Sequence, residues 1–260
     1  MKKILLVEGN LKEANQEFTE NGIKTHTESL QESISYYTNN LEIDSVNPSS
    51  DKDIFDKVKD LNKYEGLIWG GSSLNIYSDT KEIRRQIEFM KECQKRIKNI
   101  LAICWGMQVA VTAAGGVVNR GKNGAHRGIA HDIVINQDGL NHPIYKDKDK
   151  IFNTPAFNYD EVVTLPKNAI LLSSNKVNNV MALNFETEFS KIWGIQYHPE
   201  ITYEKMITLI KFRRERLLEN KSFLDEKDLE SHILMIENED KITKKESRMR
   251  ELKNWLDLIA

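Results

Sequence analysis

The stretch 100–116 (I-L-A-I-C-W-G-M-Q-V-A-V-T-A-A-G-G) constrains the fold of this chain more than any other. Its apolar residues 100–103 predict a short buried strand, and the small residues of 107–114 predict a helix that ends at a Gly-Gly pair. Cys104 therefore lies on a tight turn between a strand end and a helix start, and Gly106 keeps that turn open. The helix dipole and the unpaired N–H groups favour a thiolate there, which suits a nucleophile.

Strands and helices alternate along the chain, which is typical of an α/β fold with a mostly parallel, open sheet covered by helices on both faces. A small antiparallel section follows, with strands predicted at 170–173, 180–184 and 193–198. The predicted parallel strands are 3–7, 41–46, 66–69 and 100–103, and helices are predicted within 15–40 and at 53–61, 80–98 and 202–218.

A second polar motif lies far along the chain, in residues 192–200 (I-W-G-I-Q-Y-H-P-E). An apolar strand ends there at His198, and Glu200 follows two residues later. His198 can act as a base toward Cys104, and Glu200 can orient the imidazole ring, as in other nucleophile–base–orienter sites. Taken singly, the cysteine could be a structural residue of a turn and the glutamate a solvated one. The hypothesis of a catalytic site therefore depends on their joint occurrence.

Together these residues resemble class I glutamine amidotransferases. The family has its cysteine in a G-x-C-x-G-x-Q motif and its other two catalytic residues in an H-P-E motif. Here the motifs read A-I-C-W-G-M-Q and Q-Y-H-P-E, with Ala102 where glycine is commoner. The resemblance covers about residues 1–212 and is greatest to stand-alone domains similar to the glutaminase half of GMP synthase. It implies a flavodoxin-like α/β fold and a catalytic triad of Cys104, His198 and Glu200.

Residues 67–79 (L-I-W-G-G-S-S-L-N-I-Y-S-D) are similar to the family's oxyanion turn, with Ser72 in place of the usual proline. The resemblance implies that the backbone N–H groups of Gly71 and Trp105 hold the oxyanion. Each such donor contributes about 3–4 kcal/mol of transition-state stabilisation. Gly70 is predicted to bind substrate, and both glycines are expected to provide a positive φ in this turn.

Four further residues are predicted to bind the α-amino and α-carboxyl groups of glutamine. Gln108 lies one helical turn after Cys104, so both can face the same pocket. Residues 158–160 stand where the family often has H-G-D or H-S-D. Asp160 keeps the acidic position, Asn158 replaces the histidine, and Tyr159 lies between them. A solvated Gln108 and an Asp160 that only closes a turn are the alternatives.

Composition argues against several other classes of protein. The net charge of −2 gives no reason to expect nucleic-acid or membrane binding, and no apolar run approaches transmembrane length. The two cysteines do not make a disulfide framework, and a free Cys104 suits a reducing cytoplasm. Cys93 belongs to an apolar helical stripe, so we expect it in the core. His126 and His131 have no third ligand of suitable spacing, so we expect no metal and no cofactor.

The chain divides by composition into a predicted amidotransferase domain, residues 1–222, and a charged helical extension, residues 223–260. The extension carries a weak apolar stripe, Leu229, Ile233 and Ile236, and a stronger one near its end. Leaving the stronger stripe in water would cost about 2 kcal/mol for each large side chain. The stripe is covered either by the chain's own domain or by a partner, which would be a second copy in a homodimer or the acceptor enzyme. It consists of Met249, Leu252, Trp255, Leu256 and Ile259.

Three functions stay open at this point. The first is hydrolysis of L-glutamine to glutamate and ammonia, with the ammonia passed to a synthetase. The sequence shows no S-G-G-x-D-S loop and no P-loop, so the acceptor would be a separate chain. The second is a free-standing hydrolase of γ-glutamyl amides or peptides, for which the unusual Asn158-Tyr159 pair would be a reason. The third is a non-catalytic regulatory protein, against which the complete triad argues.

Overall fold

A nine-stranded sheet forms the centre of the protein, with the strand order β2-β1-β3-β4-β13-β12-β11-β7-β8. The computed structural model describes residues 2–259, with the side chains of all of these except residues 57 and 58. Neighbouring strands pair in parallel from β2 to β13 and antiparallel from β13 to β8. The parallel strands are β1 (Lys2–Val7), β2 (Leu41–Val46), β3 (Gly66–Trp69), β4 (Asn99–Ile103) and β13 (Lys191–Ile195). The antiparallel strands are β12 (Ala182–Glu186), β11 (Ile170–Ser174), β7 (Ala130–Ile135) and β8 (Ile151–Thr154).

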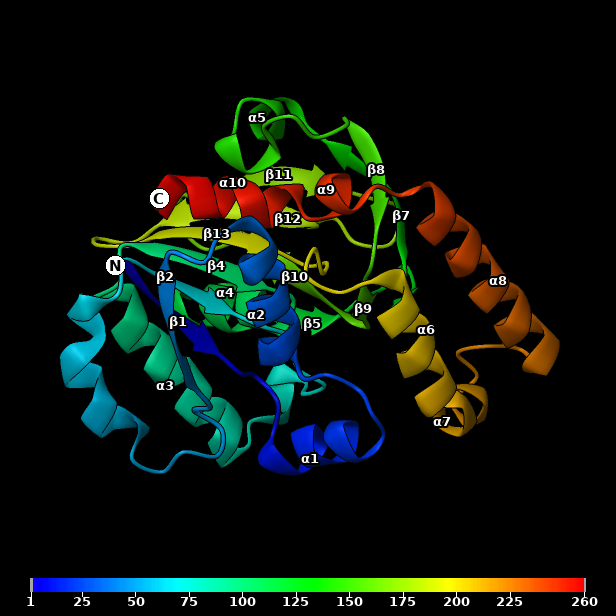
Figure 1. Cartoon of the computed structure of the whole chain (residues 1–260), viewed down its shortest axis with the longest axis horizontal. Helices are drawn as coiled ribbons and strands as arrows, with labels where there is room; N and C mark the ends of the chain where they lie inside the picture. Colours follow the sequence, from blue (N-terminus) through cyan, green and yellow to red (C-terminus); the bar gives the residue numbers. More distant parts are fainter. Residues whose placement is uncertain (1, 260) are drawn as a thin grey trace.

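Helices cover both faces of this sheet, as the alternating pattern predicts (Figure 1). Because side chains alternate along a strand, Leu5 and Val7 of β1 point to one face while Ile4 and Leu6 point to the other. The first face is covered by η1 (Ile54–Lys63), α3 (Lys81–Gln94) and α4 (Trp105–Ala113), and the second by α2 (His26–Tyr37) and α10 (Arg250–Ile259). The predicted α/β class is thereby confirmed, with an antiparallel section that is larger than expected.

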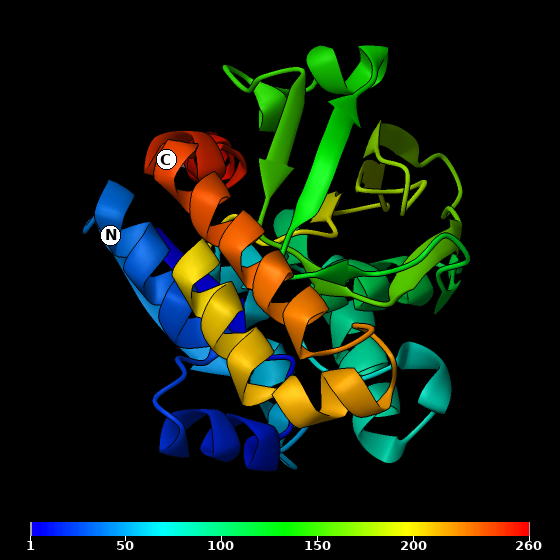
Figure 2. The ribbon, with the colours of Figure 1, turned by 90° about the vertical axis from the view of Figure 1, so that its right-hand side faces the viewer.

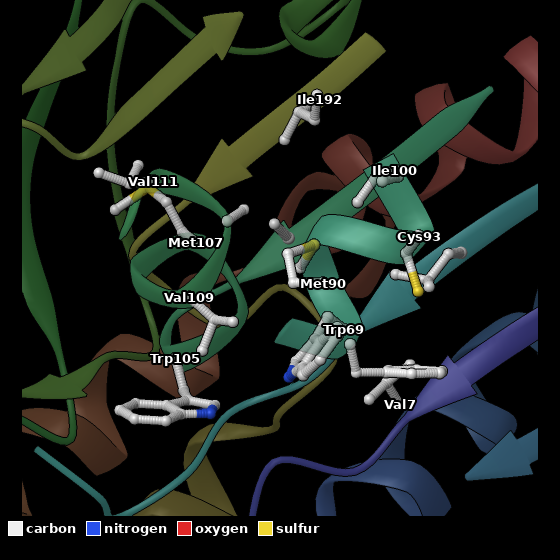
Figure 3. Close-up of a cluster of buried hydrophobic side chains, with 14 of the residues drawn as sticks. Val7, Trp69, Met90, Cys93, Ile100, Trp105, Met107, Val109, Val111 and Ile192 are labelled. Atoms are coloured by element: carbon white, nitrogen blue, oxygen red, sulfur yellow. The ribbon is translucent and has the colours of Figure 1, made fainter. Parts of the chain in front are cut away.

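Two predicted helices are interrupted for local reasons. The segment 15–40 contains α1 (Lys12–Glu20) and α2, because Gly22 adopts a φ of 67° after the end of α1 and Thr25 begins α2 with a capping box. The segment 202–218 contains α6 (Tyr203–Phe212) and α7 (Arg214–Glu219), which join at Arg213. Cys93 is buried in the core under the first face, as expected (Figure 3).

Two further sheets and five further helices complete the described part of the chain. Two small antiparallel sheets pair β10 with β5 and β6 with β9. These strands are β5 (Val117–Arg120), β6 (His126–Arg127), β9 (Phe157–Asn158) and β10 (Asp160–Thr164). The remaining helices are η2 (Ile76–Ser78), α5 (Gln137–Leu140), η3 (Pro143–Tyr145), α8 (Glu226–Ile242) and α9 (Lys245–Arg248). Among the described helices, none is long and apolar enough to cross a membrane.

The apolar stripe of the C-terminal helices is covered by the chain itself. All five of its side chains are buried, and four of them, on α10, join the core cluster under the second face of the sheet. Helix α8 lies alongside α6 (Figure 2). The stripe therefore takes the first of its two predicted roles and is not free for a partner. A homodimer through the other faces of these helices stays a prediction, as does the division at residue 222, although both parts share one core.

Trp255 is the residue that tests this packing. Its side chain is fully buried, and a Cβ added to Gly66 would lie 2.7 Å from the Cη2 atom of its ring. Trp255→Ala should therefore leave a cavity between α10 and β3 and lower the free energy of unfolding by about 3–5 kcal/mol. Urea denaturation measures this loss. Leu258→Ala is the matched control, because Leu258 is 44% exposed on the same helix and its loss should cost less than about 1 kcal/mol. Equal losses in both variants would contradict this packing.

Candidate active site

Cys104 lies where β4 ends and α4 begins, as the sequence predicts. Its backbone has φ 52° and ψ −105°, a conformation that residues other than glycine rarely adopt. Its N–H donates a hydrogen bond of 2.7 Å to the carbonyl of Ile195, which ties the turn to the end of β13. A Cβ on Gly106 would lie 2.4 Å from the carbonyl oxygen of Trp69, so position 106, two residues after the cysteine, has room only for glycine.

The predicted oxyanion turn, Gly70-Gly71, lies against the start of α4. The N–H of Gly106 donates to the carbonyl of Gly70 at 3.2 Å. Within residues 2–259, the N–H groups of Gly71 and Trp105 donate to no protein acceptor, so both are available to an oxyanion. The expectation of a positive φ at Gly70 and Gly71 is wrong. Gly71 is required for space instead, because a Cβ would lie 2.8 Å from Cε1 of His198.

His198 and Glu200 follow β13, which is the parallel neighbour of β4. Nδ1 of His198 and Oε1 of Glu200 are 2.7 Å apart, and both side chains are buried. Burial alone would lower the pKa of His198, but the electrostatic and hydrogen-bond interactions with Glu200 and Cys104 outweigh it and raise the pKa to about 10. An imidazolium between a carboxylate and a sulfur is thus the favoured state of His198 at neutral pH.

The sequence reasoning misses a second histidine in this site, His26. Its ring stacks on that of His198, with centroids 5.4 Å apart and an interplanar angle of 22°. Its Nδ1 has no hydrogen-bond partner among the described residues and lies 4.0 Å from Oε1 of Glu200. Burial, and then the charge of His198, lower the pKa of His26 well below its usual value, so its ring is neutral. The capping box of Thr25 and Glu28 predicts only that a helix begins at this residue, so the sequence carries no signal for its place in the site.

Gln196 is the other residue that the sequence reasoning misses, although it lies within Q-Y-H-P-E. Its Nε2 donates to Sγ of Cys104 at 3.4 Å. Gln108, which the sequence predicts to bind substrate, donates from its own Nε2 to Oε1 of Gln196 at 3.3 Å. Gln108 also lines the cavity that contains Cys104, so its predicted contact with substrate stays open alongside this role in orienting Gln196.

The predicted substrate residues 158–160 line the same cavity. The side chain of Asn158 is already occupied, because its Oδ1 lies 2.9 Å from Nδ1 of His126 and its Nδ2 donates to the carbonyl of Asp160 at 2.9 Å. The hydroxyl of Tyr159 is bonded to Ser222, also at 2.9 Å. Of the three, Asp160 has the acidic group that best suits an α-ammonium group, although burial raises its pKa.

Candidate metal ligands in the described part of the chain gather only at the catalytic cluster. His26, His198 and Glu200 place one ligand atom each within 4.8 Å of the others. A cation there would compete with the hydrogen bond between His198 and Glu200. His126 and His131 do not form such a group, and both ring nitrogens of His126 are bonded to asparagine side chains at 2.9 Å.

The C-terminal helices hold the segment that carries the predicted base and its orienting carboxylate. Nη1 of Arg248 donates to the carbonyls of Pro199 and, at 2.8 Å, Ile201, which flank the glutamate of the triad. Glu251 accepts a hydrogen bond of 2.7 Å from the hydroxyl of Tyr197, which precedes the histidine. These buried contacts fix the backbone on both sides of the predicted base and its orienting carboxylate.

The cysteine turn and the H-P-E segment at the ends of adjacent parallel strands define an α/β enzyme of the amidotransferase type. The chain belongs to the family described as glutamine amidotransferase class-I, whose model matches residues 22–214. It is similar in fold to a glutamine amidotransferase from Thermotoga maritima, with a TM-score of 0.65 and 16% identity. That likeness covers 99% of this chain and 97% of the other.

Relatives with curated names fall into two groups. The chain is 30% identical over 166 residues to the gamma-glutamyl-L-1-hydroxyisopropylamide hydrolase of a Pseudomonas species, a match of 63% of this chain and 56% of that protein. It is 30% identical over 158 residues to gamma-glutamyl peptidase 4 of Arabidopsis thaliana, covering 60% and 61%. It is 27% identical over 149 residues to one subunit of the glutamine-hydrolyzing GMP synthase of Methanosphaera stadtmanae, covering 57% and 72%. The match thus spans less than two thirds of the first two relatives.

His26 should act as a positioning residue for His198. His26→Ala removes the stacked ring and lets His198 turn, so we expect kcat for γ-glutamyl amide hydrolysis to fall about tenfold, or 1.4 kcal/mol. His26→Phe keeps the ring and should retain most of the activity. Steady-state kinetics of both variants give this comparison, with thermal melting as the check on folding. If His26→Phe is as impaired as His26→Ala, the ring stacking is not what matters.

Proposed function

We propose that this protein hydrolyses the γ-amide bond of L-glutamine and of related γ-glutamyl amides, with Cys104 as nucleophile. One observation carries the proposal. The Cys104 turn, the His198 imidazole and the Glu200 carboxylate are buried together, with the histidine linked to the glutamate at 2.7 Å and its pKa raised by both neighbours against the effect of burial. This is the arrangement that a thiolate nucleophile with a general acid and base requires.

The reaction proceeds in two steps. The Cys104 thiolate attacks the amide carbon, and the free N–H groups of Gly71 and Trp105 bind the oxyanion that forms. The C–N bond then breaks, and the leaving nitrogen takes the proton of His198 to give ammonia or an amine. In the second step His198 removes a proton from water, which attacks the thioester and releases the γ-glutamyl group as glutamate. In both steps Glu200 holds the imidazole of His198 in the required orientation through its hydrogen bond to Nδ1. These steps use only the chain's own groups, the substrate and water.

The leaving group distinguishes two forms of this function. If it is ammonia, we expect the acceptor to be a separate synthetase chain, which the similarity to the Methanosphaera GMP synthase protein supports. If it is a larger amine, the enzyme acts alone, and the similarities to the Pseudomonas hydrolase and the Arabidopsis peptidase support this form. We place either form in the cytoplasm, where Cys104 stays reduced. A homodimer through the outer faces of the C-terminal helices remains a hypothesis.

Cys104→Ala tests the nucleophile. The change removes the sulfur but little volume at a turn, so the fold should persist while release of ammonia from glutamine, or of amine from a γ-glutamyl amide, falls below detection. A coupled glutamate assay measures the loss, and circular dichroism checks the fold. A glutamine-like electrophile should label Cys104 in the native protein and spare the buried Cys93. Residual hydrolysis by the folded variant would contradict the mechanism.

The raised pKa of His198 predicts an alkaline limit of activity. Below a pH of about 10 the imidazole keeps the proton that it gives to the leaving nitrogen, and above it the proton is lost. We therefore expect kcat/KM to fall with a midpoint near pH 10. Glu200→Gln removes a charge that raises this pKa, so the fall should occur about one pH unit lower, or more. Identical alkaline limits in the pH–rate profiles of the two proteins would argue against this pair.

A further inference from the structure

The cavity at Cys104 has both a polar and an apolar lining, and release of ammonia does not require the apolar one. Its polar lining comes from the loop after β3, from α4 and from the β9–β10 region, whereas a set of apolar side chains comes from α1, β9 and the segment after the triad. The apolar side chains of this set, which we call the apolar chamber, are Phe18, Phe157, Ile201, Met206, Leu209 and Leu217. Most of them also form one buried cluster beside the triad segment. These side chains therefore give the cavity an apolar lining, which a substrate with an apolar leaving group would contact.

Two arginines of the α6–α7 junction line this chamber without acidic partners. Arg213 is half-buried between Phe157 and Phe18, whose ring centroids lie 5.0 Å and 5.8 Å from its guanidinium carbon. Neither it nor the exposed Arg216 forms an ion pair or a side-chain hydrogen bond with any described residue. Burial, and then the charge of Arg216, lower the pKa of Arg213, whereas Tyr159 and the carboxylate of Glu17 raise it by less.

Arg214, which lies between Arg213 and Arg216 in the sequence, differs from both in having acidic partners. Its side chain points to α8, where Nε donates to Glu226 at 3.0 Å and Nη1 to Glu230 at 2.7 Å. The acidic helix α8 therefore neutralises Arg214 and leaves the other two facing the cavity. A guanidinium that lines a cavity without a carboxylate partner is suited to a carboxylate supplied by a ligand.

One residue of the chamber follows His198 closely in the sequence. His198 gives its proton to the leaving nitrogen, so that nitrogen must be close to His198. Ile201, three residues further along the chain, belongs to the apolar chamber. The charge of Arg213 also acts on His26, the histidine that stacks on His198. It helps to lower the pKa of His26, although burial, His198 and Lys205 are larger causes. His198, Ile201 and the two arginines therefore line the same cavity.

We propose that Arg213 and Arg216 bind the carboxylate of an amino-acid leaving group, and that the preferred substrates are γ-glutamyl dipeptides whose second residue is apolar. The apolar side chain of that residue occupies the chamber, and its α-carboxylate pairs with the two guanidinium groups. The reaction stays as above, since the amine nitrogen of the second residue takes the proton of His198 when the C–N bond breaks. This assignment rests on the proposed γ-glutamyl hydrolysis and names its substrate class.

The test compares γ-glutamyl-leucine with γ-glutamyl-leucinamide, which lacks only the negative charge. We expect the native enzyme to cleave the acid with a kcat/KM at least tenfold higher than the amide. Arg213→Met with Arg216→Met should abolish this preference, whereas Arg214→Met, the control, should leave it unchanged. If the native enzyme shows no preference, the anion subsite is overturned. If the double variant loses rate equally on both substrates, the arginines bind the glutamyl carboxylate instead, and the proposal is also overturned.

Binding to the inactive Cys104→Ala variant separates the subsite from the chemistry. Calorimetry should give a Kd for γ-glutamyl-leucine at least tenfold lower than for the amide, and the two methionine substitutions should remove the difference. Hydrolysis of glutamine but not of γ-glutamyl-leucine by the native enzyme would overturn the substrate class and leave the proposed function standing. Hydrolysis of neither substrate would count against the proposed function, and the binding difference would then decide the subsite alone.

Discussion

The parallel pairing of β4 with β13 is the interaction on which the site depends. In its register Ile103 lies beside Ile195, and the next N–H, that of Cys104, continues the pairing to the Ile195 carbonyl. Both strands therefore leave the sheet at the same edge and level, where parallel strands of α/β proteins place their ligands. His198 comes three residues further on and needs only a short turn to reach the cysteine. A change of register would separate nucleophile and base even if every side chain were kept.

The C-terminal helices belong to this same construction. Trp255 fills the space over Gly66 of β3, so α10 covers the second face of the sheet as closely as α2 does. At the end of α9, just before this helix, Arg248 donates to the carbonyls on both sides of Glu200. A buried guanidinium that satisfies two buried carbonyls holds a loop that has little regular structure of its own. Residues 223–260 therefore stabilise the segment around Glu200, which their charged composition alone does not indicate.

Sequence patterns predict what is local and miss what depends on tertiary contact. The parallel strands follow from apolar runs, and Cys104 and His198 from motifs contiguous in sequence. His26 lies far from both in sequence, and nothing around it distinguishes it from a surface histidine until α2 brings it against His198. The sequence suggests a positive φ for Gly71, whereas the crowding by two histidine rings that requires this glycine exists only in the folded chain. Arg213 cannot be told from Arg214 by sequence, because only the position of α8 separates their partners.

The charge state of His26 completes the electrostatics of the site. Two protonated histidines stacked at 5.4 Å would repel each other and would compete for Glu200, whose Oε1 is within 4.0 Å of both. Burial prevents this, because it makes the charged form of His26 too costly, and the nearby cations His198, Lys205 and Arg213 add to the cost. Among the described residues, Glu200 is therefore left with one hydrogen-bond partner, His198, whose raised pKa keeps its ring protonated at neutral pH. Arg213, which we propose to bind the carboxylate of the leaving group, is one of the cations that lower the pKa of His26. It therefore also contributes to keeping His26 neutral.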